Sequence, residues 1–166
     1  MEDEKIIKFV KRSIKDILEK DSLLFINNVN EPTISYKLGQ YLQTRFKEYN
    51  VDCEYNRNVE DEDLRKKIYL QSEGEAGSIE SREVRPDIII HKRGLNTHNL
   101  CVLEIKKNTS SSVDIEFDRT KLKAYTTDQN NNLNYQIGFL IIFTVLTRNE
   151  EYQIEVFKNG EQIREY

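Results

Sequence analysis

Two apolar segments near the middle of the chain, Val84–Lys92 and Leu100–Lys107, constrain its fold more than any other feature. Both have the length and the β-branched residues of strands, and the short stretch between them suits an antiparallel hairpin. With a tip at Leu95–Thr97, Asp87 lies opposite Glu104, because the midpoint of positions 87 and 104 falls between 95 and 96. The hairpin would therefore bring charged side chains together within an apolar sheet.

Alternation along the second strand gives the hairpin a charged face. Successive side chains of a strand point to opposite sides, so Glu104 and Lys106 share one face and Ile105 lies on the other. Asp87 and Lys106 are also close in register, since their midpoint falls between 96 and 97. Two carboxylates and an ammonium beside aliphatic residues suit a divalent metal and a water better than a core.

Composition limits the class of protein. A chain of 166 residues fits one core, and we expect residues 1–166 to form a single domain. No apolar run is long enough for a membrane span, and the charged first residues do not form a signal peptide, so we expect a cytoplasmic protein that does not bind membranes. The net charge of −4 argues against tight non-specific DNA binding, although a metal site gathers carboxylates and gains positive charge from its ion.

Hydrophobic spacing predicts two helices ahead of the hairpin, at residues 4–20 and Glu31–Tyr49. Val51–Asn58 alternates apolar and polar residues, which is typical of a strand. The charged stretch 59–83 is expected to contain a short helix around Asp63–Leu70 and then a mobile loop.

After the central hairpin the sequence predicts one helix, one central strand and a second hairpin. Glu116–Thr127 has helical spacing with Phe117 on the inward side, and Gln136–Leu146 is the apolar run of a central strand covered on both faces. Tyr152–Phe157 and Glu161–Tyr166 predict a terminal hairpin. The sequence therefore predicts an α/β fold with a mixed central sheet, in which an αβββαβ core follows an N-terminal helix and precedes a C-terminal hairpin.

The hairpin segments Arg85–Ile90 and Cys101–Lys107 resemble the signature of the PD-(D/E)XK nuclease superfamily, which has the restriction-endonuclease-like fold. Three shorter segments are similar to a group of small, mostly uncharacterised bacterial members: Asn30–Pro32, Val51–Arg57 and Lys121–Tyr125. The similarity extends from about residue 31 to residue 143. It implies an αβββαβ core and Mg²⁺-dependent cleavage of nucleic acid.

The resemblance matches Asp87 and Glu104 to the metal-binding acids and Lys106 to the active-site lysine. Carboxylate oxygens are ligands that Mg²⁺ and Mn²⁺ prefer, and the Ile105 carbonyl would add another oxygen. The expected cofactor is Mg²⁺, for which Mn²⁺ can substitute. A Glu-x-Lys sequence such as Glu104–Lys106 occurs by chance on many exposed strand faces, and a Pro-Asp sequence such as Pro86-Asp87 opens many strands or turns. Their matching register on consecutive apolar strands nevertheless favours a site.

Glu31 is a further candidate metal ligand. Many superfamily members carry a metal-linked Glu on the helix before the first core strand, and Glu31 matches that position. It also lies three residues before Ile34 and seven before Leu38, on the stripe that faces the core. The alternative is a first-turn Glu that complements the helix dipole.

Four more residues are candidates for substrate or supporting contacts. Lys121 and Tyr125 lie four apart on one side of a helix, where the resemblance places a polar residue and a tyrosine facing the site. A surface lysine above a core tyrosine explains the same spacing. Glu54 and Asn56 share the polar face of a strand beside the hairpin, and they either support the site or form an exposed edge.

We therefore expect a hydrolase, a Mg²⁺-dependent deoxyribonuclease that hydrolyses phosphodiester bonds of DNA with a metal-activated water oriented by Lys106. The nucleic-acid substrate follows from the resemblance alone. Cutting both strands of a duplex would require two sites, in a homodimer or by sequential nicking. The alternative is a catalytically silent module of the same fold that binds nucleic acid or a partner protein.

Overall fold

The computed structural model describes residues 1–55, 67–71, 79–127, 133–148 and 151–166. Within these residues the chain is an α/β protein with four helices, a mixed open sheet of six strands and a separate two-stranded ribbon. The helices are α1 (Asp3–Lys20), α2 (Leu23–Ile26), α3 (Glu31–Arg45) and α4 (Ser112–Thr126). The strands of the sheet are β1 (Asn50–Cys53), β4 (Ile88–Lys92), β5 (Leu95–Lys107), β6 (Ile137–Phe143), β7 (Tyr152–Lys158) and β8 (Glu161–Glu165), and the ribbon is β2 (Lys67–Gln71) with β3 (Ile79–Glu83).

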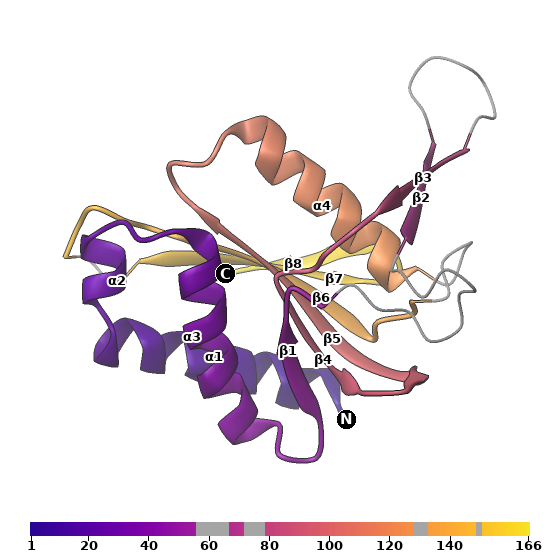
Figure 1. Ribbon diagram of the computed structural model, residues 1–166, viewed down its shortest axis with the longest axis horizontal. Helices are drawn as coiled ribbons and strands as arrows, with labels where there is room; N and C mark the ends of the chain where they lie inside the picture. The colour runs from indigo at the N-terminus through magenta and orange to yellow at the C-terminus, as the bar shows by residue number, and fades with distance from the viewer. Residues whose placement is uncertain (56–66, 72–78, 128–132, 149–150) are drawn as a thin grey trace.

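The six strands lie in the order β1-β4-β5-β6-β7-β8 (Figure 1). β5 and β6 pair in parallel, with α4 as the crossover between them, and the other neighbouring strands pair antiparallel. This arrangement confirms the predicted α/β class and the mixed sheet. In the described part of the chain, no helix is long and apolar enough to span a membrane.

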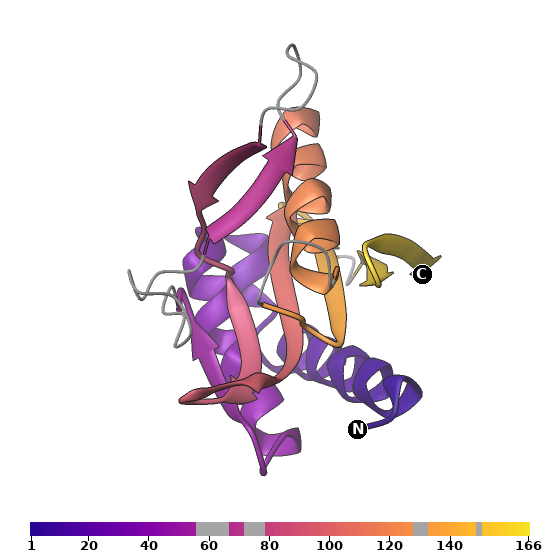
Figure 2. The ribbon, with the colours of Figure 1, turned by 90° about the vertical axis from the view of Figure 1, so that its right-hand side faces the viewer.

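Helices cover both faces of the sheet. α1 and α3 pack on one face around a large apolar cluster, and α4 packs on the other face around a smaller one (Figure 1). All residues of β6 are buried between these layers, which confirms that Ile137–Phe143 is a central strand. The β2–β3 ribbon extends beyond the sheet beside α4 (Figures 1 and 2).

The β4–β5 hairpin has the predicted register. Ile88 pairs with Leu103, and one step further along the strands Asp87 lies opposite Glu104. The predicted tip was wrong, because the turn lies two residues earlier and ends on Gly94 at a φ of 83°. Register shifts at His91, near the turn, compensate for the earlier turn, so that the pairing of Ile88 with Leu103 is still the predicted one.

Two predictions around the charged segment were wrong. The strand expected over Val51–Asn58 ends at Cys53, because Glu54 adopts a left-handed backbone with a φ of 54°. The helix expected around Asp63–Leu70 is replaced, where the structure describes it, by β2 paired with β3. The segments of this ribbon are short and rich in charge, and in so short a stretch local spacing does not distinguish a strand from a helix. The remainder of that expected helix and most of the expected loop lie outside the described residues.

Helix ends also differ from the prediction. The helix expected to reach Tyr49 ends at Arg45, and the one expected from Glu116 begins four residues earlier. Its start is set by Ser111, whose hydroxyl accepts a hydrogen bond from the Asp114 N–H at 3.1 Å. Phe117, predicted to point inward, is 38% exposed.

An ion pair fastens β1 to the end of β4. Asp52 accepts a 2.8 Å hydrogen bond from Arg93 Nε and lies 2.9 Å from His91 Nε2. The Arg93 hydrogen bond lowers the pKa of Asp52. The resulting stabilisation is fully present above the unfolded-state pKa of about 3.9, and it is lost as the pH falls through the lower folded-state value.

We expect Asp52→Asn to reduce the free energy of unfolding by about 1 kcal/mol at neutral pH, a modest value because Arg93 is largely exposed. The loss should shrink as the pH falls below the unfolded-state value. Urea denaturation at several pH values measures it, with the exposed neighbour Glu54→Gln as control. A loss that stays constant with pH would contradict the assignment.

Candidate active site

Charged side chains from several elements meet where β4 begins and β5 ends. This carboxylate–lysine cluster consists of Asp87 before β4, Glu104 and Lys106 on β5, Glu31 at the start of α3, and Asp118 and Lys121 on α4. Glu104 and Lys106 both contact α4, whereas Ile105 packs in the core beneath α1 and α3. The predicted alternation along β5 is therefore confirmed.

Asp87 is held by the backbone on both sides of it. Its Oδ2 accepts a 2.6 Å hydrogen bond from the Ile105 N–H, and its own carbonyl accepts a 3.1 Å hydrogen bond from the Glu54 N–H. Burial raises the pKa of Asp87 to about 6, although the Ile105 hydrogen bond and the charge of Lys106 oppose the shift. A carboxylate fixed this way is orientated before any ligand arrives.

Glu104 is the most deeply buried carboxylate of the cluster, at 1% exposure. Its Oε1 lies 3.0 Å from Lys121 Nζ. Burial, and then the neighbouring charge of Asp87, raises the pKa of Glu104 well above its ordinary value, and Lys121 only partly offsets this. Keeping this carboxylate ionised therefore costs free energy in the folded chain, and groups with such shifted pKa values are typical of functional sites.

Lys106 lies between α3 and α4. Its Nζ is 3.2 Å from Glu31 Oε2 and 2.9 Å from Asp118 Oδ2. Burial alone would lower the pKa of Lys106, but the hydrogen bond with Asp118 and the charges around it raise the value instead. Glu31 is itself anchored, since its Oε1 accepts a 2.9 Å hydrogen bond from Ser110. Two elements thus hold the ammonium in place.

Asp118 was not among the residues predicted from sequence. It is 2% exposed and lies 2.6 Å from Lys121 Nζ as well as beside Lys106. The signal was its spacing, because it precedes Lys121 by three residues and Tyr125 by seven, on one helix face. It was overlooked because isolated acids in a charged helix are usually solvated.

The predicted residues of α4 face the cluster. Lys121 contacts Glu104, and Tyr125 is fully buried on the same side of the helix. Burial, followed by the charge of Glu104, raises the pKa of Tyr125 well above its ordinary value. Glu54 reaches the site only through its backbone N–H, since the residue is exposed, and Asn56 lies outside the described residues.

The chemistry of the cluster fits a divalent metal of the Mg²⁺ type. Glu104 Oε1 and Asp118 Oδ2 are buried carboxylate oxygens, and each lies beside a lysine ammonium, at 3.0 Å from Lys121 Nζ and 2.9 Å from Lys106 Nζ. Carboxylate oxygens gathered in this way are the ligand type that Mg²⁺ prefers. No three acids, histidines or cysteines of the described chain are arranged to ligate a metal together. Mg²⁺ needs only one or two carboxylates because it keeps several waters, so Asp87, Glu104 and the Ile105 carbonyl suffice.

Fold and site together define an α/β protein whose mixed sheet carries a buried carboxylate–lysine cluster at its central hairpin. Comparisons of the chain with protein-family models, with curated proteins and with solved structures found no match. What the chain does is therefore inferred from the cluster itself.

Proposed function

We propose that the chain is a metal-dependent nuclease of the PD-(D/E)XK type with the restriction-endonuclease-like fold. The observation that carries the proposal is the hairpin register, which sets Asp87 opposite Glu104 with Lys106 on the same face. The order of α3, β1, β4, β5, α4 and β6 supports the fold assignment, because it matches the αβββαβ core that the resemblance implies.

In this proposal Asp87, Glu104 and the Ile105 carbonyl hold Mg²⁺ or Mn²⁺, and Glu31 is the further ligand, directly or through a water. The metal, when bound, lowers the pKa of a coordinated water and neutralises charge that develops on the phosphate. The substrate is nucleic acid, with DNA as the expected form. The oxygen of the water forms a bond to phosphorus and gives up one proton to solvent, the ester bond to the leaving oxygen breaks, and that oxygen takes a proton from solvent.

Lys106 positions the attacking water or a phosphate oxygen by donating hydrogen bonds from its ammonium. Glu31 and Asp118 hold that ammonium from two sides, at 3.2 and 2.9 Å. Lys121, at the same face of α4, supplies a second cation for the phosphate. The chain's own contribution is thus orientation and positive charge.

Removal of the lysine tests the proposal. With Mg²⁺ or Mn²⁺ present, the purified protein should cleave single- or double-stranded DNA or RNA, and Lys106→Met should lower the rate about 100-fold or more. Lys92→Met, at an exposed position on β4, is the matched control and should keep full activity. Thermal melting of both variants separates lost chemistry from lost folding. Equal rates in a folded Lys106→Met protein, or no metal-dependent cleavage of any of these substrates, would overturn the proposal.

The second candidate, a catalytically silent module of the same fold, is favoured by one observation. The Lys121 ammonium lies 3.0 Å from Glu104 Oε1, so a lysine can balance the carboxylate without any metal. Calorimetric titration with Mn²⁺ distinguishes the two. Binding that Glu104→Gln removes supports the nuclease, and absence of binding in the wild-type protein favours the module.

A further inference from the structure

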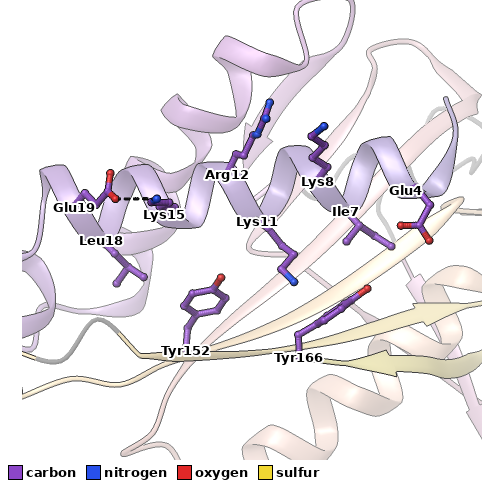
Figure 3. A pocket seen from close by; sticks show the side chains of 10 residues that line it. All are labelled: Glu4, Ile7, Lys8, Lys11, Arg12, Lys15, Leu18, Glu19, Tyr152 and Tyr166. Carbon is purple, nitrogen blue, oxygen red and sulfur yellow. Dashed lines mark ion pairs between the residues drawn. The ribbon is translucent and has the colours of Figure 1, made fainter.

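A second charged surface lies away from the carboxylate–lysine cluster. Helix α1, Tyr152 of β7 and Tyr166, which follows β8, line an open hollow of about 530 Å³ (Figure 3). Volumes of this size are typical of ligand sites. The hollow lies at the β7–β8 edge of the sheet, whereas the cluster lies where β4 begins and β5 ends, between the start of α3 and α4. It is therefore a separate feature that the proposed nuclease chemistry does not use.

The helix side of this hollow, here called the basic groove, is a row of cations. Lys8, Lys11, Arg12 and Lys15 are spaced three, four and seven residues apart, which places them on one side of α1. Lys15 pairs with Glu19 at 3.4 Å, but the other three form no ion pair with any residue of the described chain. A chain with a net charge of −4 thus concentrates unbalanced positive charge here.

The strand side of the basic groove is aromatic. Tyr152 begins β7, and Tyr166 follows β8, where it is fixed by two backbone hydrogen bonds with Ile154 of 2.9 and 3.0 Å. Lys11 Nζ lies over one face of the Tyr166 ring, 3.7 Å from its centre, and Tyr166 as a whole residue is 45% exposed. In Figure 3 Lys11 points toward the tyrosines, whereas the side chains of Lys8 and Arg12 extend from α1 in the direction away from them.

We propose that the basic groove binds a short single-stranded segment of nucleic acid. The cations would contact successive phosphates, and an exposed tyrosine face would stack on a base. The row from Lys8 to Lys15 spans about 10 Å at the α-helical rise, which suits a piece of extended backbone rather than one phosphate. An acidic peptide would match the charge but leave the tyrosine ring without a stacking partner, so the aromatic side favours nucleic acid.

The experiment measures the anisotropy of a short fluorescent oligothymidylate in the presence of EDTA, so that no divalent metal contributes. We expect Lys8→Ala/Lys11→Ala to weaken binding about 10-fold and to lower the salt slope by about 1.4, because two phosphate contacts are lost. Tyr166→Ala should weaken binding several-fold through loss of stacking. The charge-matched control, Lys47→Ala/Lys92→Ala, removes two exposed lysines elsewhere and should bind as the wild type does. Alanine preserves the exposed face of α1, so folding is retained.

Three results would overturn the proposal: equal losses in the groove and control double variants, no effect of Tyr166→Ala, or groove-dependent binding of thymidine monophosphate without binding of the oligonucleotide. The last result would indicate a free nucleotide as the ligand. Binding measured in EDTA requires no divalent metal, whereas the proposed cleavage does. Groove binding can therefore succeed or fail independently of nuclease activity.

Discussion

Glu104→Gln is expected to lower metal-dependent cleavage about 1000-fold or more while leaving the fold at least as stable as the wild type. The activity loss follows because the variant lacks a carboxylate ligand, and a metal supplies several kcal/mol of transition-state stabilisation. Stability is retained because the wild-type carboxylate is buried beside Asp87 and Asp118, and only Lys121 forms an ion pair with it in the described chain. Glutamine keeps the shape without the charge. Lost activity with unchanged or higher stability is typical of a residue kept for function.

Cleavage rates at saturating Mg²⁺ and urea unfolding of the same preparation measure both quantities. Glu116→Gln is the matched control, since that side chain is 61% exposed on α4 and pairs only with Arg119 among the described residues. It should change neither quantity appreciably. A stable Glu104→Gln protein with wild-type cleavage would remove Glu104 from the site.

Phe139→Ala is expected to destabilise the fold by about 3–5 kcal/mol, the largest effect on stability that we predict. Phe139 is fully buried at the centre of β6, paired with Leu103 on one side and Val156 on the other. Removing its ring leaves a cavity between the sheet and the helices above it. Since the free energy of unfolding of a typical domain is about 5–15 kcal/mol, the variant would lose much of it.

Phe117→Ala is the control for this prediction. Sequence spacing predicted an inward Phe117, but the structure leaves it 38% exposed, so its replacement should cost about 1 kcal/mol or less. Chemical denaturation of both variants gives the comparison. Similar losses for the two phenylalanines would mean that α4 is rotated relative to the structure described above.

The register of Asp87 against Glu104 could be predicted from sequence although the tip was misplaced, because register shifts near the turn compensate for the earlier turn. Alternation along β5 then placed Glu104 and Lys106 on one face, and the structure has them there. The uninterrupted apolar run of β6 likewise indicated a strand buried on both faces. These features are local, or depend only on the pairing of adjacent strands.

Other features could not be predicted in this way. The β2–β3 ribbon was expected to be a helix and a loop, because its strands are short and rich in charge and local spacing there does not distinguish a strand from a helix. Asp118 matters only because α4 crosses over β5 and brings Lys106 within 2.9 Å of it. A carboxylate on a charged helix is ordinarily solvated, so burial was the missing information.

The central claim is that Asp87 and Glu104 together hold a divalent metal. A crystal structure of the protein soaked in Mn²⁺ tests it most directly, through the anomalous signal of the ion. We predict one strong peak in contact with oxygens of Asp87 and Glu104 and with the Ile105 carbonyl, and we expect the Lys121 ammonium to have moved away from Glu104. Saturating Mn²⁺ that leaves Lys121 on Glu104, with no anomalous peak between the two carboxylates, would contradict the claim.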